Sequence, residues 1–132
     1  MKFLKSFEGP IYSLARIVVG FLFLQHGAQK LFGVLGGAGG SGEPAALFSL
    51  MGLAGVIEFF AGLLIMLGWF TVYAAFVASG LMAVAYFMAH APQGFWPILN
   101  GGELAAFYAW IFLFFAAKGP GTWSLDRLFG RK

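Results

Sequence analysis

The feature that most constrains how this chain can fold is a series of four apolar stretches, each about as long as a bilayer crossing. A helix needs about 20 apolar residues to span the hydrocarbon core of a membrane. Only 10% of the 132 residues are charged and 61% are hydrophobic, whereas about a quarter of a soluble domain is charged. We therefore expect an all-α integral membrane protein, a single four-helix bundle over residues 1–132. The predicted helices cover about residues 11–32, 48–70, 72–91 and 100–118.

Local signals mark the ends of these helices. Pro10 stands where a first-turn proline is tolerated. The glycine-rich stretch 33–42 ends the first helix, and it lacks the GK[ST] ending of a phosphate loop, so we interpret it as a flexible connector. The third helix is expected to stop before Pro92, because the residue before a proline disfavours helix.

Basic residues indicate how the bundle is oriented. The loop after the third helix has no Lys or Arg, and an even number of crossings puts both chain ends on one side. Since Lys and Arg concentrate in cytoplasmic segments, we expect both termini in the cytoplasm of a bacterium, with the chain in its inner membrane. No A-x-A cleavage pattern follows the first apolar stretch, so we expect that helix to be retained. The basic residues outside the first and last helices are Lys2, Lys5, Arg127, Arg131 and Lys132.

The segment after the fourth helix has the pattern of a short helix at the membrane interface. Residues 122–130 contain the capping residue Ser124 and then alternate polar with apolar side chains, as a short amphipathic helix at the interface would. Arg16 lies in the cytoplasmic half of the first helix. We expect it to form a structural charge pair with Asp126.

The remaining polar residues gather at the opposite, periplasmic end of the predicted bundle. A charged side chain within the membrane costs about 2.5–3.5 kcal/mol on insertion scales, so such residues are functional candidates by default. His26 and Lys30 are i, i+4 neighbours, and Glu58 shares a face with Gly55 and Gly62, where another helix can approach. We predict catalytic roles for Glu58, His26 and Lys30. Predicted substrate-binding residues are Gln29, Tyr86, His90, Asn100 and Glu103.

Several of these residues also have structural interpretations, which stay open. Asn100 and Glu103 have the N-cap and N3 spacing of a capping box. Lys30 and His90 stand near helix C-termini, where the helix dipole favours a cation and a long side chain can reach the interface.

Composition limits the chemistry that this chain can perform. It has no cysteine, which excludes disulfides and thiolate ligands, and we predict no metal site. Ligation of haem by two histidines has little support, because the sequence contains just two, His26 and His90, and we expect no haem. No basic stripe interleaved with aromatic residues is present, and we expect no nucleic-acid partner.

Six motifs distributed over nearly the whole chain form a specific combination: LARI at 14–17, QHGAQKLFG at 25–33, EFFAGL at 58–63, LGWF at 67–70, NGGE at 100–103 and GPGTWSLD at 119–126. With this combination the sequence resembles the DoxX family. The resemblance implies a four-helix bacterial inner-membrane protein. Members of that family are linked to the membrane part of a thiosulfate:quinone oxidoreductase and to membrane complexes that handle oxidative or thiol stress.

Two functions remain open at this stage. The first is a quinone-linked oxidoreductase subunit, in which quinone is the expected cofactor and His26, Lys30, Glu58 and His90 supply proton donors and acceptors. A small anion such as thiosulfate would instead use Lys30 and His26. The alternative is a non-enzymatic scaffold, or a small-solute binding or transport protein, associated with a redox complex. Expected partners are the lipid bilayer and another oxidoreductase subunit, and the Gly and Ala faces would suit a homo-oligomer.

Overall fold

Helices make up every regular element of the computed structural model, which describes residues 1–131, and that range contains no β-strand. The prediction of an all-α chain is therefore confirmed. The long helices are α2 (Glu8–Phe32), α3 (Leu50–Leu67), α4 (Thr71–Ala85) and α6 (Glu103–Lys118). The short elements are α1 (Lys2–Lys5), η1 (Ala38–Gly40), η2 (Tyr86–His90), η3 (Ala91–Gln93), α5 (Pro97–Asn100) and α7 (Leu125–Leu128).

Three helical segments are long and apolar enough to cross a membrane. They are α2, α3 and the continuous run Thr71–Gln93, in which α4 is extended by η2 and η3. The fourth predicted helix is shorter than expected, because α6 begins at Glu103 rather than at residue 100. At 1.5 Å per residue, its 16 residues are about 24 Å long, and the hydrocarbon core is about 30 Å thick. The fourth crossing thus stays a prediction.

The third predicted helix does not end as a regular α-helix. After Ala85 the chain continues as a single π-helical turn, Tyr86–His90, and Pro92 is accommodated in the first turn of the 3₁₀ segment that follows. Single π-helical turns within helices occur often at functional sites. This turn rotates the end of α4 and sets the direction of His90.

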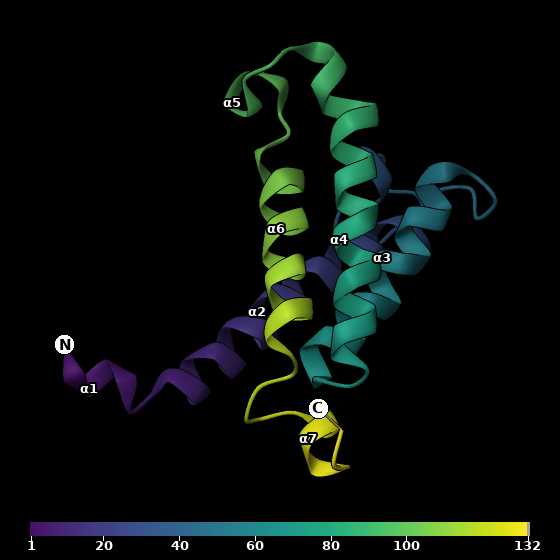
Figure 1. Ribbon diagram of the computed structural model, residues 1–132. Helices are drawn as coiled ribbons and strands as arrows, with labels where there is room; N and C mark the ends of the chain where they lie inside the picture. Colours follow the sequence, from purple (N-terminus) through teal and green to yellow (C-terminus); the bar gives the residue numbers. More distant parts are fainter. Residues whose placement is uncertain (132) are drawn as a thin grey trace.

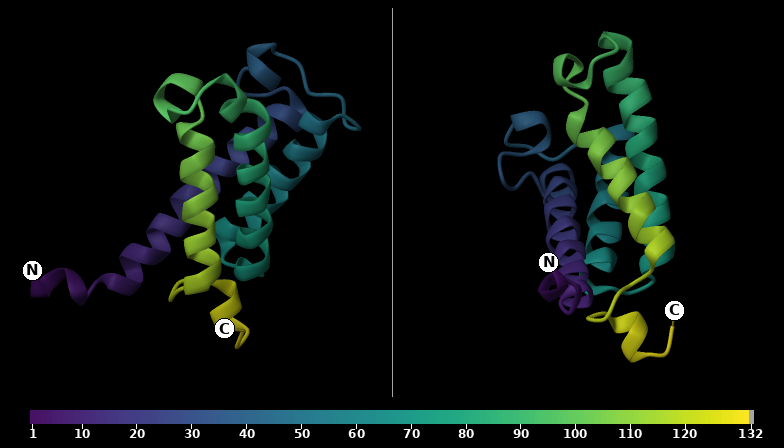
Figure 2. Two further views of the ribbon diagram at one scale, coloured as in Figure 1. Left: turned by 45° about the horizontal axis from the view of Figure 1, so that its top comes forward. Right: turned by 60° about the vertical axis from the view of Figure 1, so that its left-hand side comes forward.

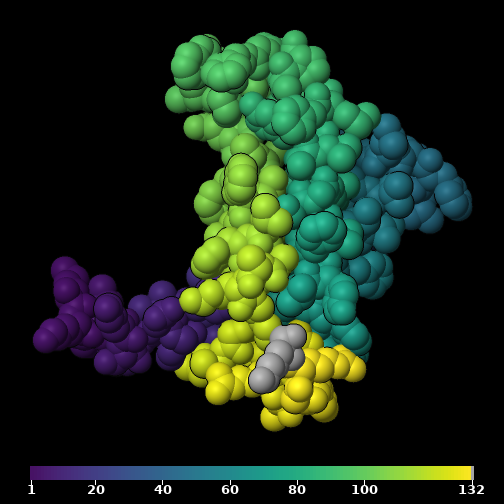
Figure 3. Space-filling model, in the orientation of Figure 1, coloured from purple at the N-terminus to yellow at the C-terminus, as the bar shows by residue number. Residues whose placement is uncertain are grey.

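The helices pack in two neighbouring pairs, α2 with α3 and α4 with α6, and α3 also contacts α4 (Figures 1 and 2). We call the end with connectors 33–49 and 91–102 the loop end, and the end with residues 119–131 the tail end. The first turns of α2 stand away from the other helices, whereas α7 covers the tail end (Figure 3). In Figure 1, α1 lies at the left of the molecule and α7 at the bottom, and the cytoplasmic location of both termini stays a prediction. Lys132, one of the basic residues used for that prediction, lies outside the described residues.

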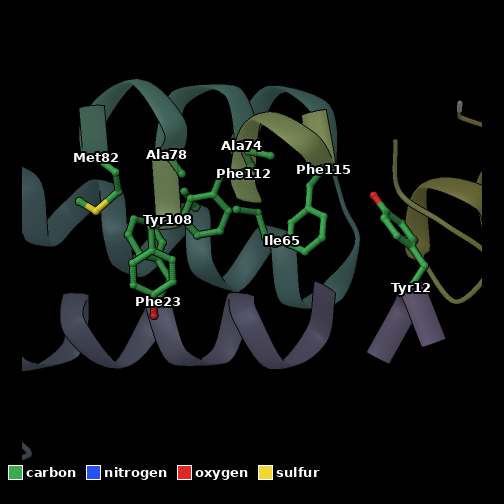
Figure 4. Close-up of a cluster of buried hydrophobic side chains, with 11 residues drawn as sticks. Tyr12, Phe23, Ile65, Ala74, Ala78, Met82, Tyr108, Phe112 and Phe115 are labelled. Carbon is green, nitrogen blue, oxygen red and sulfur yellow. The ribbon is translucent and has the colours of Figure 1, made fainter. Parts of the chain in front are cut away.

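The apolar core forms where the two helix pairs meet. Phe23 of α2 lies against Tyr108 and Phe112 of α6, with ring centroids 5.2 and 4.6 Å away (Figure 4). The small side chains of Ala75 and Ala78 on α4 are fully buried in the same cluster. Side chains from α2, α3, α4 and α6 therefore share one core.

Glycines bring α2 and α3 into backbone contact. Gly20 and Gly27 on α2 are seven residues apart, as are Gly55 and Gly62 on α3. A Cβ atom on Gly62 would lie 2.6 Å from the backbone nitrogen of Leu24, and one on Gly20 would lie 2.6 Å from that of Met66. The small-residue face predicted around Glu58 is thus a real contact face.

The predicted charge pair of Arg16 and Asp126 does not form as a direct contact. Arg16 is fully buried, and its guanidinium donates to the carbonyl oxygens of Ile65, Met66 and Trp123. The Asp126 carboxylate instead accepts from the backbone N–H groups of Phe70 and Thr71, both at 2.9 Å. Arg16 thus binds carbonyls at the carboxyl end of α3 and one carbonyl of the tail, whereas Asp126 binds the N–H groups that begin α4.

The predicted tail helix is a single turn. Ser124 caps it as expected, because its Oγ accepts from the backbone N–H of Arg127 at 3.2 Å. The tail is held to the turn between α3 and α4 by Asp126, whose backbone N–H donates to the carbonyl of Gly68 at 2.8 Å. The tail is thus hydrogen-bonded to the turn between α3 and α4, which lies far away in the sequence.

Candidate functional site

A cavity of about 300 Å³ lies near the loop end, between the two helix pairs. It is walled by α2 and α3 on one side and by α4, η2 and α6 on the other. This volume stands at the low end of the range of about 300–1,000 Å³ for small-molecule pockets. The polar side chains that line it are His26, Lys30, Glu58, His90 and Tyr108, and the apolar ones include Phe23, Met82 and Leu104.

An ion pair between α2 and α3 forms one wall of the cavity. Lys30 Nζ lies 2.5 Å from Glu58 Oε1 and donates a hydrogen bond to it. Lys30 can reach inward because Gly55 has no side chain: a Cβ atom there would lie 2.7 Å from Lys30 Cβ. The partners are 28 positions apart and the whole connector lies between them, so the pair also ties the end of α2 to the middle of α3.

Glu58 has a second oxygen that is left without a donor. The residue is only 2% exposed, and Oε2 has no hydrogen-bond partner among the described residues. Buried polar atoms are nearly always satisfied, and an unsatisfied one costs about 1–3 kcal/mol. An unsatisfied carboxylate oxygen at a cavity wall is therefore a place where a ligand with a donor group would be stabilised.

Aromatic side chains of α2 and α6 bound the cavity on another side. The His26 ring lies edge-on to Tyr108, with centroids 6.1 Å apart and planes at 84°. Tyr108 in turn stacks on Phe112 at 5.3 Å, with an interplanar angle of 8°. A flat, mostly apolar surface thus stands next to the ionisable groups.

The π-helical turn contributes His90. Its Nδ1 lies 3.1 Å from the carbonyl oxygen of Asn100. A carbonyl oxygen can only accept, so Nδ1 carries the hydrogen in this contact, and Nε2 is left as the nitrogen that can exchange a proton. The chain passes this close because of Gly102, where a Cβ atom would lie 2.8 Å from His90 Cβ and 2.6 Å from Tyr86 Cε2.

Four predicted binding residues do not line this cavity. The side chain of Gln29 donates to the carbonyl of Leu35 at 2.7 Å, which closes the start of the connector. Tyr86 lies on the opposite side of the α4–α6 pair, beside a groove with Ser79 and Trp110. Asn100 is buried in the loop, and Glu103 is exposed at the start of α6.

The predicted capping box of Asn100 and Glu103 is wrong. Gly102 is the N-cap of α6, which places Glu103 at the first helical position. The Asn100 side chain accepts from the N–H of Gly102 at 2.8 Å and donates to the carbonyl of Gly94 and the hydroxyl of Tyr86, at 2.9 and 3.3 Å. The cause is α5, a short helix that ends at Asn100, after which Gly101 turns the chain with a φ of +72°.

Sequence reasoning missed Tyr108, the residue through which α6 reaches the cavity. A tyrosine within an apolar helix is usually part of the core, and Tyr108 is 3% exposed. Tyr108 shares a helix face with Leu104 and Ala105, which also line the cavity, but no sequence signal distinguishes that face from the core. Within residues 1–131, no group of three or more His, Cys, Asp or Glu side chains is arranged to hold a metal ion.

Comparison with known proteins gives a consistent result. The model of the DoxX family matches residues 11–91, which include His26, Lys30, Glu58 and His90. The chain is 41% identical to an uncharacterized protein of Haemophilus influenzae, with 100% of each chain covered. It is 33% identical to an uncharacterized membrane protein of Mycobacterium tuberculosis, with 95% of this chain and 85% of that protein covered. No solved structure matches the chain at a significant level.

Proposed function

Since this chain belongs to the DoxX family of membrane proteins, as the resemblance predicted, we propose that it is a membrane subunit of a quinone-linked oxidoreductase. Its cavity at the loop end is the proposed site of the quinone headgroup. The observation that carries the proposal is Glu58, a buried carboxylate with one oxygen held by Lys30 and the other without a donor at the cavity wall.

The residues around the cavity fit the chemistry of a quinone headgroup. Bound quinone would supply a two-electron, two-proton acceptor. Glu58 Oε2 can accept a hydrogen bond from a hydroxyl, while the His26 ring and His90 Nε2 can hold or release a proton. The rings of Phe23 and Tyr108 offer the flat apolar surface that an aromatic headgroup requires.

The ion pair favours a neutral headgroup over a small anion. Lys30 was the expected cation for an anion such as thiosulfate, but its ammonium is already matched by the Glu58 carboxylate at 2.5 Å. Binding an anion there would leave Glu58 buried without its partner, at a cost of several kcal/mol. A neutral ligand leaves the pair intact.

The proposed setting is a bacterial inner membrane, with four crossings, both termini cytoplasmic and the cavity toward the periplasm. Lys and Arg near the termini support this orientation. α6 would complete its crossing with the help of α5 and the loop before Glu103. Because the chain has no cysteine, the electron donor for the quinone is proposed to be a separate oxidoreductase subunit.

Thermal unfolding in the presence of the reduced, quinol form of a short-chain quinone analogue tests this function, because only the quinol hydroxyl can donate to Glu58 Oε2. The analogue is expected to raise the unfolding midpoint of the purified protein in a concentration-dependent way. Glu58→Gln should weaken that effect by about tenfold in analogue concentration, because a charge-assisted hydrogen bond is lost.

Glu103→Gln is the matched control: it makes the same chemical change at the same end of the molecule, on an exposed residue outside the cavity. It should respond to the analogue as the unaltered chain does. If no analogue shifts the midpoint and no quinone co-purifies after mild extraction, the quinone site is refuted and the non-enzymatic alternative is favoured.

A further inference from the structure

A second cavity, of about 610 Å³, lies at the tail end, far from Glu58 along the helices. It is open to the surface and is lined by the first turns of α2, the loop after α6, and the segment from α7 to Arg131. Its charged lining consists of Glu8, Lys118, Arg127 and Arg131.

Positive charge dominates this cavity. Lys118 Nζ lies 3.0 Å from Glu8 Oε1, so the one lining carboxylate is already matched. Neither Arg127 nor Arg131 forms an ion pair with any carboxylate among residues 1–131. The Arg131 guanidinium lies over the ring of Phe70, 4.3 Å from its centroid, which fixes its position and leaves its N–H groups free to donate.

The walls of the cavity are held by hydrogen bonds across the chain. Tyr12 donates to the carbonyl of Gly119 at 2.6 Å, and the Ser13 and Thr122 hydroxyls are 3.1 Å apart. The backbone N–H of Trp123 donates to Ser13 Oγ at 3.1 Å. These bonds join residues more than 100 positions apart and hold the loop that leads to α7 and the two arginines. Because this loop is ordered before a ligand binds, less conformational entropy of the chain is lost on binding.

The surrounding side chains are typical of the membrane interface. Trp123, Leu128 and Phe129 are more than half exposed around the tail. Apolar and aromatic side chains on a short amphipathic segment insert at the depth of the lipid headgroups. The cavity therefore opens where lipid phosphates are abundant.

We propose that the tail-end cavity binds the phosphate group of an anionic phospholipid, with Arg127 and Arg131 as its donors. Guanidinium groups bind phosphate oxygens with two parallel hydrogen bonds, and basic pockets between membrane helices recognise anionic headgroups. The Lys118–Glu8 pair closes the side of the cavity next to α2, and Tyr12 lines its floor. The site is independent of the quinone proposal, since it shares no residue with the loop-end cavity.

Native mass spectrometry of the delipidated full chain, incubated with equal amounts of phosphatidylglycerol and phosphatidylcholine, tests the site. The unaltered chain should retain phosphatidylglycerol in preference to phosphatidylcholine. The double variant Arg127→Gln/Arg131→Gln should lower that preference by about tenfold, because two charge-assisted contacts are lost. Both arginines are exposed, so the variant is expected to fold.

Lys2→Gln/Lys5→Gln is the matched control, because it removes the same charge near the N-terminus from residues that do not line the cavity. It should keep the lipid preference. Equal loss in both double variants, or equal retention in both, would overturn the site. Displacement of the lipid by millimolar inorganic phosphate would also overturn it, since the cavity would then bind a free anion.

Discussion

At the scale of single residues, the contact between Lys30 and Glu58 sets the charge of the loop-end cavity. Neither charge would be stable alone at this depth, since Glu58 is 2% exposed and the cavity is largely apolar. The pair satisfies one carboxylate oxygen and leaves the other available. We therefore propose that Glu58 serves ligand binding as well as stability.

Removing only one partner of this pair should destabilise the protein. In Lys30→Met, Glu58 loses its one donor, and we expect a loss of about 3 kcal/mol, the lower end for a broken buried pair because Lys30 is partly exposed. The double variant Lys30→Met/Glu58→Leu should recover most of that stability. Thermal unfolding followed by tryptophan fluorescence measures both. Equal stability of the single and double variants would contradict the role assigned to the pair.

The residues of this cavity could be predicted from the sequence to different degrees. His26, Lys30, Glu58 and His90 could be expected together, because a charged residue in an apolar helix needs a partner at the same depth. Tyr108 could not, since nothing in its helix distinguishes it from a core residue. The hydrogen bonds of Asn100 depend on where α6 begins. The spacing of Asn100 and Glu103 suggested that Asn100 is the N-cap of this helix, but the turn at Gly101 makes Gly102 the N-cap instead.

At the scale of elements, the contact between α2 and α3 controls the geometry of the site. Lys30 and Glu58 stand on these two helices, and the glycines between them allow the backbones to touch. Because the glycines on each helix are seven residues apart, they lie on one face of that helix, and the two glycine faces stay in contact where the helices cross. The close approach was predictable from Gly55 and Gly62, but the opposing pair on α2 was not, because its orientation depends on the whole fold.

A methyl group at this contact should be damaging. In Gly27→Ala the new Cβ would overlap the backbone nitrogen of Phe59, and we expect a loss of about 1–3 kcal/mol from overpacking. Gly80→Ala is the control, because a Cβ at Gly80 meets nothing within 4 Å on an exposed face of α4. That variant should be neutral or more stable than the unaltered chain. Unfolding midpoints compare the two, and similar effects at both positions would refute the tight contact.

At the scale of the whole molecule, the two ends have different chemistry. The tail end carries the cavity with Arg127 and Arg131 and a tail held by Arg16 and Asp126, whereas the loop end carries the cavity with Glu58. The carbonyls that Arg16 binds, those of Ile65, Met66 and Trp123, lie 49, 50 and 107 positions away along the chain. Backbone acceptors of this kind leave no trace in the sequence, and for that reason an ion pair with Asp126 was expected instead.

Orientation in the membrane can be tested directly, because the chain has no cysteine. A membrane-impermeant thiol reagent applied to intact spheroplasts should label Ser41→Cys, in the connector at the loop end. It should label Ser6→Cys, near the N-terminus, only after the membrane is permeabilised. Both serines are exposed, so accessibility reports the side of the membrane. The reverse labelling pattern would place the cavity in the cytoplasm.

The central claim is that the loop-end cavity holds a quinone headgroup, and photolabelling with an azido-quinone tests it most directly. Irradiation of the protein in lipid nanodiscs, followed by peptide mapping, should place the label on peptides that contain Met82 to His90 or Gly101 to Tyr108. Excess unlabelled quinone should prevent the labelling. Labelling confined to the tail end, or spread evenly over the lipid-facing surfaces and insensitive to competitor, would contradict the account.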